Sequence, residues 1–375
     1  MKTGGTEVQT LRQVEALVAG GYQCVTVCYF EYDYKTVELF KQAGSEVVCL
    51  SAYGLRPSSQ REIIQFLRDG LRRVVDKYKP AIAHVQYMNP GAIPILLLYG
   101  MGVETILATS HTNANIYRNL RLIHFLQRHI LKAFICVTEN AERSFFRKST
   151  LFDENYKLKR RNHFTIPNCL SPKESDAFSV GVTSSTSDNN DNRRRGRLRT
   201  ICFAAQLKPI KGADFVMLAF AKVLERHPDC RLMIVGDGEL REEMEKQQHS
   251  LGIPDEKVVW QGYVEHNKLQ ELFNEMDIVW GPSRSEGFGL SILEAMAHGC
   301  AVVASSVGGL TEIVHDGHDG LLFPSGDTDK LAELTCQLLD NPEKMNMIKG
   351  NAIANASHYS FDKYKERILS LYKQL

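Results

Sequence analysis

Two glutamates, Glu286 and Glu294, flank a glycine-rich turn and the start of an apolar stretch within residues 285–299. The glycines of this turn, Gly287 and Gly289, allow the backbone to approach a ligand closely. The backbone amides that open the following helix are unpaired donors with partial positive charge, which is the environment that a phosphate requires. The two carboxylates can accept hydrogen bonds from hydroxyl groups. The segment therefore predicts a site for a phosphorylated sugar, although each glutamate by itself is also typical of a solvated surface position.

Two further turns place glycine next to charge where predicted strands end. Lys211 and Gly212 follow the apolar run Thr200–Ala205, so the lysine can meet a phosphate while the glycine turns the chain. Gly236 and Gly238 follow a second apolar run, and open α/β sheets bind ligands at the carboxyl ends of their strands. The glycine spacing differs from the GxGxxG fingerprint of dinucleotide-binding proteins.

Short apolar or β-branched runs alternate with amphipathic helical stretches along the whole chain. This alternation is typical of parallel sheets covered by helices on both faces, and it occurs in both halves, so we predict two doubly wound α/β domains. The predicted strands are Cys24–Phe30, Glu46–Leu50, Ala81–Gln86, Glu104–Ser110, Phe134–Thr138, Asn162–Ile166, Thr200–Ala205, Cys230–Val235, Val258–Gln261, Ile278–Pro282, Ala301–Ser305 and Gly320–Phe323.

The predicted boundaries follow changes in composition. Residues 1–170 form the first domain and residues 198–355 the second, and residues 356–375 form a helix that crosses back to the first domain. Residues 171–197 are rich in Ser, Asn and Asp and cannot bury a core, so we predict a flexible insertion or linker there. Its arginine run, 193–195, is typical of a solvated loop, and contact with nucleic acid or anionic lipid is the alternative.

The N-terminus lacks room for an element that such a fold needs. Gly4 and Gly5 resemble the turn after the first strand of a Rossmann-like domain, and the helical pattern Glu7–Val18 follows them. A strand of about 5 residues does not fit before this turn. We therefore expect the first strand to be missing, either because the true start lies upstream of Met1 or because the sequence is truncated.

Composition excludes several classes of protein. The 375 residues are 43% hydrophobic and 24% charged, which is typical of a globular protein with two domains. The net charge of +1 conceals an excess of basic residues before residue 170 and of acidic residues after it. The nine cysteines form no CxxC pair, and no apolar stretch is long enough to span a membrane. We expect reduced cysteines and a cytoplasmic protein, with at most a peripheral contact at the inner face of the membrane.

Taken in order, these segments resemble the retaining glycosyltransferases of family 4, among the glycosyl transferases group 1. The resemblance covers nearly the whole chain, and it is carried by the Gly4-Gly5 turn, the strand that ends at His111, the turn 207–212, Gly236-Asp237-Gly238, the glutamate pair, and residues 301–323. It implies the GT-B fold, in which two Rossmann-like domains face a central cleft. The implied activity is hexosyl transfer from a UDP-, GDP- or ADP-sugar to a hydroxyl of a glycan or lipid-linked glycan, with retention and without a metal or other cofactor.

The same resemblance assigns the donor site. Glu294 would hold the ribose hydroxyls, and Glu286 would hold hydroxyls of the transferred sugar because carboxylates accept strong hydrogen bonds. Amides at the start of the helix would cradle the diphosphate, and the Gly4-Gly5 loop would approach it from the other domain. The remaining donor-binding positions are Gln206, Lys211, Gly236, Gly238, Gly287, Phe288, Gly289, Leu290 and Ser291.

Three side chains would carry the catalysis. Lys211 would neutralise the departing phosphate, which is electrostatic stabilisation of a leaving group. Glu286 would position the sugar, and His111 would orient the donor sugar without attacking it. As a loop residue, His111 is otherwise typical of a helix cap. Family members generally retain configuration by front-side displacement, so no residue is assigned as a covalent nucleophile.

One position departs from the family pattern. Relatives read Gly-Arg-Leu where this chain reads Ala205-Gln206-Leu207. A glutamine amide replaces the bidentate, charged donor of an arginine with a neutral bond. Weaker diphosphate binding, a different donor, and compensation by another cation such as Arg284 are all open.

Two other patterns have alternative interpretations. Asp327-Thr328-Asp329 has the spacing of a metal-binding DxD motif, but it precedes the predicted helix 330–339 and favours helix capping. The histidines show no close ligand spacing, so we predict no metal site. Residues 117–132 alternate basic and apolar residues at helical spacing, which suits either an anionic membrane surface or an ordinary helix with a solvated basic face.

Two other functions compete with glycosyl transfer. A GT-B sugar-nucleotide epimerase would use the same donor site, but it needs acid and base carboxylates that we do not find. A nucleotide-sugar-binding pseudoenzyme is favoured by Gln206 and by the absent first strand. The sequence leaves the donor base, the sugar, the acceptor and the oligomeric state undetermined.

Overall fold

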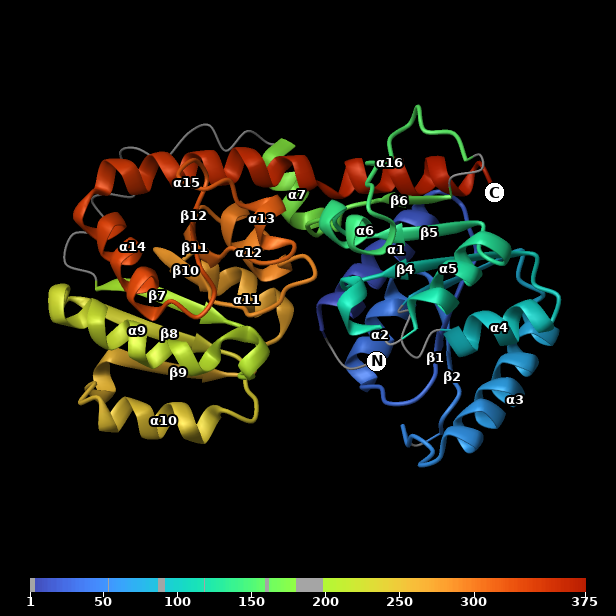
Figure 1. Cartoon of the computed structure of the whole chain (residues 1–375), viewed down its shortest axis with the longest axis horizontal. Coiled ribbons are helices and arrows are strands. Elements are labelled where there is room, and N and C mark those ends of the chain that lie inside the picture. The colour runs from blue at the N-terminus through green and yellow to red at the C-terminus, as the bar shows by residue number, and fades with distance from the viewer. Residues whose placement is uncertain (1–3, 53, 87–91, 118, 159–161, 180–197) are drawn as a thin grey trace. The chain divides into compact units, whose positions relative to one another are not determined.

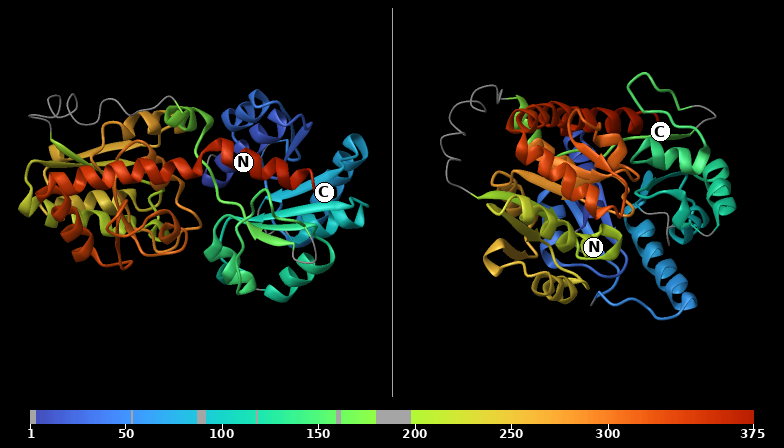
Figure 2. Two further views of the ribbon diagram at one scale, coloured as in Figure 1. Left: turned by 90° about the horizontal axis from the view of Figure 1, so that it is seen from above. Right: turned by 60° about the vertical axis from the view of Figure 1, so that its left-hand side comes forward.

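The computed structural model describes residues 4–52, 54–86, 92–117, 119–158, 162–179 and 198–375. The chain divides into two compact units, Met1–Ser171 with Phe361–Leu375, and Pro172–Ser360. Each unit is built on parallel strands with helices beside them (Figure 1; Figure 2). All twelve predicted strands are present, with ends that differ by at most two residues from the prediction, and the predicted α/β class is confirmed.

The first unit contains two separate parallel sheets. One pairs β1 (Cys24–Cys28) with β2 (Ser45–Cys49). The other has the order β3-β4-β5-β6, formed by Ile82–Gln86, Thr105–Ser110, Ala133–Cys136 and His163–Thr165. The helices are α1 (Gly5–Ala19), α2 (Tyr34–Gln42), α3 (Gln60–Tyr78), α4 (Ala92–Gly100), α5 (Leu120–His129), α6 (Glu139–Phe146) and α16 (Phe361–Tyr372), with the 3₁₀ turn η1 (Ala114–Ile116).

Among the described strands of this unit, β1 pairs only with β2, and β3 pairs only with β4. In the described part of the chain, β1 and β3 therefore belong to separate sheets. Residues of β1 are mostly half-buried, whereas β4 is almost completely buried, as expected for a strand with neighbours on both sides. Helix α1 starts directly at the glycine turn, where the Val8 amide donates to the carbonyl of Gly4 at 3.0 Å.

The second unit contains one six-stranded parallel sheet with the order β12-β11-β10-β7-β8-β9. Its strands are β7 (Arg199–Ala204), β8 (Cys230–Val235), β9 (Val258–Gly262), β10 (Ile278–Gly281), β11 (Ala301–Ser305) and β12 (Leu321–Phe323). Its helices are α7 (Pro172–Ser179), α9 (Ala213–Arg226), α10 (Arg241–Ser250), α11 (His266–Phe273), α12 (Leu290–Ala297), α13 (Leu310–Ile313), α14 (Thr328–Asp340) and α15 (Pro342–Ala356), and its 3₁₀ turns are η2 (Pro209–Lys211), η3 (Asp255–Lys257) and η4 (Ser357–Tyr359).

The strand order of this sheet creates a switch point between β7 and β10. The chain leaves β7 toward β8 and β9, and then returns to place β10 on the opposite side of β7. Connections that diverge in this way leave a crevice at the carboxyl ends of the two strands, which is where open α/β sheets bind ligands. The loops that follow β7 and β10 contain Lys211 and Glu286, so topology alone directs both residues to this crevice.

A large core holds these strands in place. Trp280 on β10 is fully buried against β7 and β11, and its indole Nε1 donates to Thr335 Oγ1 of α14 at 2.9 Å. Phe203 on β7 and Phe323 on β12 are buried in the same core. Because full burial of a large apolar side chain contributes about 1.5–3 kcal/mol, this cluster fixes the strand ends that carry the site.

The cysteines and the basic helix bear on two further predictions. All nine cysteines are free, and seven are buried, as expected for reduced core residues. Within the described chain, we find no helix that combines the length and the apolarity needed to span a bilayer.

On α5, Ile123 and Leu126 are buried in the core, while Phe125 is 51% exposed. Most of the apolar face of α5 is therefore used for packing within the unit. Membrane contact through this helix stays a prediction.

Candidate functional site

The ammonium of Lys211 and the carboxylate of Glu286 form the centre of the site. Lys211 Nζ lies 2.6 Å from Glu286 Oε2, and the side chains are 29% and 17% exposed. Ser283 Oγ donates to the same oxygen at 3.2 Å. The pair joins the loop after β7 to the loop after β10 across the switch point. Because an ammonium has three donors, Lys211 can hold Glu286 and still donate to a phosphate oxygen.

Gly212 explains how the lysine reaches this position. Its φ of 71° is in the left-handed region, and it separates η2 from α9. A Cβ at this position would lie 2.0 Å from the carbonyl oxygen of Pro282. Only glycine therefore lets the loop after β7 pass this close to the end of β10, and this approach brings Lys211 to Glu286.

The loop after β8 supports the loop after β7. Gly236 has a φ of 130°, and a Cβ there would lie 2.0 Å from the carbonyl oxygen of Ala205. The amide of Leu207 donates to the carbonyl of Asp237 at 3.0 Å. Gln206 lies between these contacts with its side chain exposed. The two turns are thus packed backbone to backbone, which is the close approach that the glycines predict.

Helix α12 directs its N-terminus into the same region. Gly289 precedes it with a φ of 103°, and the carbonyl of Gly289 accepts the amides of Ile292 and Leu293, both at 3.0 Å. The amides of Leu290 and Ser291 come before these first intrahelical bonds. They concentrate the positive end of the helix dipole where a diphosphate would bind.

A glycine pair that the sequence analysis did not single out fixes Glu286. The amide of Gly309 donates to the carbonyl of Glu286 at 3.0 Å, and a Cβ at Gly308 would lie 2.0 Å from that same oxygen. Gly309 itself packs against the backbone of Gly287 and Phe288. The adjacent glycines after β11 are the sequence signal that could have identified this contact.

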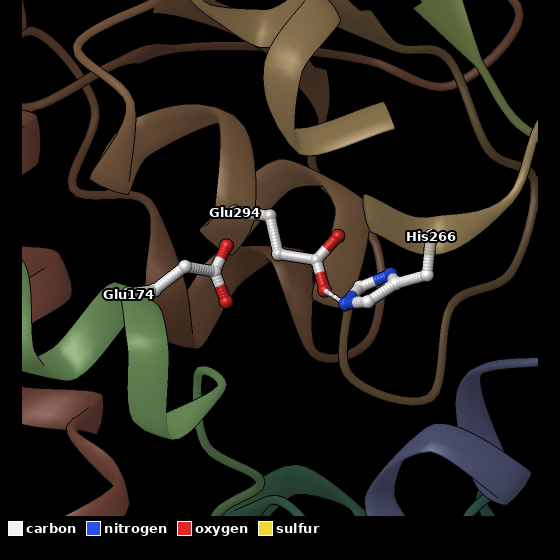
Figure 3. Close-up of side chains that lie close together, drawn as sticks. All are labelled: Glu174, His266 and Glu294. Carbon is white, nitrogen blue, oxygen red and sulfur yellow. Dashed lines mark ion pairs between the residues drawn. The ribbon is translucent and has the colours of Figure 1, made fainter. Parts of the chain in front are cut away.

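Glu294 lies one turn into α12 and is only 4% exposed. Its Oε1 lies 3.6 Å from Nε2 of His266, the first residue of α11 (Figure 3). Glu174 of α7 lies close to both side chains. Neither His266 nor Glu174 has a sequence pattern that predicts this position, because the three residues come from separate elements.

In the first unit, His111 follows β4 and is 8% exposed. Its Nε2 lies 3.0 Å from Gln86 Oε1, and Gln86 Nε2 donates to Gln13 Oε1 at 2.9 Å. Burial lowers the pKa of His111 to about 4, so the imidazole is neutral at pH 7. A neutral imidazole in a fixed hydrogen-bond chain suits orientation of a sugar hydroxyl. Gln86 and Gln13, which orient it, were missed because isolated glutamines form no motif.

Arg284 is engaged elsewhere in the second unit. Its guanidinium donates to both carboxylate oxygens of Asp214, at 2.7 and 2.6 Å, and stacks over Phe215 at 4.1 Å. This bidentate bond lowers the pKa of Asp214 below its usual range. Compensation for Gln206 by Arg284 is therefore disfavoured, since a phosphate would have to displace an existing bidentate partner.

The structure also describes two other predicted features, the motif at residues 327–329 and the turn at residues 4–5. Asp327 caps α14, because its side chain accepts the amide of Lys330 at 2.9 Å, and the capping interpretation of Asp327-Thr328-Asp329 is confirmed. Gly4 and Gly5 open α1 in the first unit. Their approach to a donor stays a prediction. Residues 172–179 of the predicted insertion form α7 instead, whereas its residues 180–197, with the arginine run, lie outside the described residues.

The architecture and the switch-point site together define a class of protein. Two units with parallel Rossmann-like sheets are the GT-B fold, and solved GT-B structures match the chain throughout. HepE of Anabaena, solved with UDP, with UDP and glucose, and with UDP-glucose, matches with TM-scores of 0.73–0.77 at 18% identity, covering 100% of this chain and 97% of that one. At this identity the likeness shows the fold alone.

The similarity to a known family lies in the second unit. Residues 184–355 match the family model of glycosyl transferases group 1. This part of the chain, just under half of its length, is therefore similar to glycosyl transferases group 1, as the sequence predicted. A D-inositol 3-phosphate glycosyltransferase of Acidothermus cellulolyticus is 35% identical over 182 residues, 46% of this chain and 40% of that protein. An uncharacterized glycosyltransferase of Methanocaldococcus jannaschii is 35% identical over 176 residues, 47% and 45% of the two chains. The match thus spans less than half the length of these relatives.

Proposed function

We propose that this protein is a retaining glycosyltransferase of family 4 that transfers a hexose-type sugar from a nucleoside-diphosphate sugar to a hydroxyl group. The Lys211–Glu286 pair at the switch point is the observation that carries the proposal. It sets a cation for a leaving phosphate beside a carboxylate for sugar hydroxyls. The amides that open α12 supply further positive charge.

In the proposed reaction, the bond between the anomeric carbon and the β-phosphate oxygen breaks, and a bond from the acceptor oxygen to the same face of that carbon forms. The acceptor proton passes to an oxygen of the departing phosphate. Lys211 and the amides of Leu290 and Ser291 stabilise the charge that develops on the phosphate, which is the largest electrostatic change in the reaction. His111 orients the sugar as a neutral hydrogen-bonding group.

A UDP-sugar is the first donor to test. The solved structure of HepE contains UDP-glucose, and the matched Acidothermus protein is described as acting on D-inositol 3-phosphate. We extend only the donor chemistry to this chain, with GDP- and ADP-sugars as alternatives. The acceptor class that we propose is a glycan or lipid-linked glycan.

A thermal-shift screen of the full chain against UDP-, GDP- and ADP-sugars tests donor binding. A ligand at 100 times its dissociation constant raises the free energy of unfolding by about 2.7 kcal/mol. Calorimetry of Glu294→Ala then tests the ribose contact, and a donor affinity at least tenfold weaker is expected from the loss of a charged hydrogen bond. Glu271→Ala, an exposed glutamate on α11 paired with Lys268, is the matched control. Unchanged affinity in Glu294→Ala would contradict its assigned role.

Turnover assays separate the competing functions. Sugar transfer that needs an acceptor and persists in EDTA supports the proposal, whereas donor turnover without an acceptor favours an epimerase. Donor binding without sugar release to any acceptor or to water favours a pseudoenzyme.

Replacing Gln206 with the arginine of the family pattern tests how this position affects donor binding. In Gln206→Arg a charged bidentate donor replaces a neutral one, so donor affinity is expected to rise about tenfold. If Gln206→Arg leaves affinity unchanged, the departure from the family pattern does not weaken diphosphate binding.

A further inference from the structure

We propose that Glu174, His266 and Glu294 form a binding site for a divalent transition-metal ion, with Zn²⁺ as the best match. One ligand atom from each side chain lies within 4.8 Å of those of the other two. The residues come from α7, α11 and α12, all within the second unit (Figure 3). No motif in the sequence predicts this site, which is separate from the catalytic lysine.

The burial of two carboxylates at one place is the first argument. The side chains of Glu174 and Glu294 are only 4% and 6% exposed. Two buried carboxylates this close repel each other, which favours a cation beside them. A divalent cation between them carries enough charge to neutralise both.

His298 supplies a second, independent argument. Its Nε2 lies 3.4 Å from Glu174 Oε1, and its Nδ1 lies 3.0 Å from Asn274 Oδ1. The amide nitrogen of Asn274 faces the carbonyl of Gln270, so the oxygen faces the imidazole. Asn274 thus holds the Nδ1 side of the ring, and the Nε2 side faces Glu174. A hydrogen-bonded Nδ1 is the usual support of a metal-bound histidine, so His298 is placed to act as a further ligand.

The donor set indicates the metal. Two carboxylates with one or two imidazoles are ligands for Zn²⁺ and related ions, whereas Mg²⁺ and Ca²⁺ prefer oxygen alone. Tetrahedral ligands about 2.0 Å from zinc are roughly 3.3 Å apart, so the cluster has to contract modestly when it binds. His266 is 21% exposed and leaves a route for the ion to enter. Gln270 Nε2, 3.2 Å from His266 Nε2, would turn away in that contraction.

The site also connects to donor binding. Glu294 is the proposed ribose ligand, so a bound metal ion and a nucleotide would compete for the same carboxylate. This second part rests on the proposed function, whereas metal binding itself does not. We therefore infer that zinc inhibits by raising the dissociation constant of the nucleotide, and that Glu174 makes this inhibition possible without contacting the nucleotide.

Calorimetric titration of the chelator-stripped full chain with Zn²⁺ tests the site. One equivalent is expected to bind, at least tenfold more weakly in His266→Ala and in Glu174→Gln. His249→Ala, which removes an exposed histidine on α10, is the control and is expected to bind as the unmodified chain does. Co²⁺ substitution adds a spectroscopic test, because a mixed imidazole and carboxylate site gives tetrahedral d–d bands that His266→Ala loses. If zinc does not bind, or binds equally to all variants, the proposal fails.

A second titration with UDP separates the two parts. Zinc is expected to weaken UDP binding at least fivefold in the unmodified chain and to have no effect in Glu174→Gln, each compared with its own affinity for UDP without zinc. If UDP does not bind at all, the proposed donor is wrong and the zinc titration still decides the metal site. If UDP binds equally well with and without zinc, the competition is refuted.

Discussion

Replacing Lys211 with methionine tests the centre of the proposed site. The change keeps the length of the side chain but removes the ammonium that lies 2.6 Å from Glu286 Oε2. A hydrogen bond to a charged group contributes about 1.5–3 kcal/mol. If Lys211 makes one such bond to the departing phosphate, Lys211→Met is expected to lower kcat/KM by about 10- to 150-fold, because 1.4 kcal/mol corresponds to a factor of ten.

The effect is expected mainly in kcat, because the phosphate gains charge as the bond to the sugar breaks. A coupled assay for nucleoside diphosphate release measures it. Lys222→Met is the matched control, since Lys222 lies on α9 of the same unit and pairs with Asp329 at the surface. A kcat for Lys211→Met within twofold of the unmodified enzyme would refute the assignment.

A double-mutant cycle separates catalysis from structure. In Lys211→Met, Glu286 keeps only the Ser283 hydroxyl among the side-chain donors that we identify, so the free energy of unfolding is expected to fall by about 1 kcal/mol. Adding Glu286→Gln removes the uncompensated charge and is expected to restore part of that stability without restoring turnover. Recovery of turnover in the double variant would mean that Lys211 acts only by holding Glu286.

Three further predictions concern the scaffold and its response to pH. Gly236→Ala places a Cβ against a carbonyl at a φ of 130°, so urea denaturation is expected to show a loss of at least about 2 kcal/mol, whereas Gly317→Ala, at a φ of 74° in open space, loses about 1 kcal/mol. Burial lowers the pKa of His84 to about 3 and of His111 to about 4, so the unfolded chain binds more protons below its ordinary histidine pKa of about 6.5. The free energy of unfolding is therefore expected to fall as pH drops from about 6.5 toward 4, by up to about 1.4 kcal/mol per pH unit for each histidine, and an unchanged pH dependence in His84→Gln would contradict this. Asp327→Ala removes the cap of α14 and is expected to lower stability by about 1 kcal/mol, measured by the midpoint in urea, with no change in turnover or in its metal dependence.

Local sequence patterns determined the strands, the helices and the glycine turns of this protein. Apolar runs of strand length alternate with amphipathic helices, and the side-chain period and the burial of both sheet faces follow from that alternation. The strands were therefore predictable to within two residues. Glycines that require a positive φ, such as Gly212 and Gly289, were also readable, because only glycine adopts that conformation at little cost. These local rules identified the turns that carry Lys211 and Glu286.

Only the tertiary structure decided which residues meet. Strand order placed β10 beside β7 and brought Lys211 to Glu286, although 75 residues separate them in the chain. Tertiary packing also set Gln86 against His111, brought Glu174 and His266 to Glu294, and turned Arg284 toward Asp214. Side chains such as these carry no periodic signal. Their neighbours are fixed by the packing of a shared core and by the topology of the sheet, both of which depend on contacts distant in sequence.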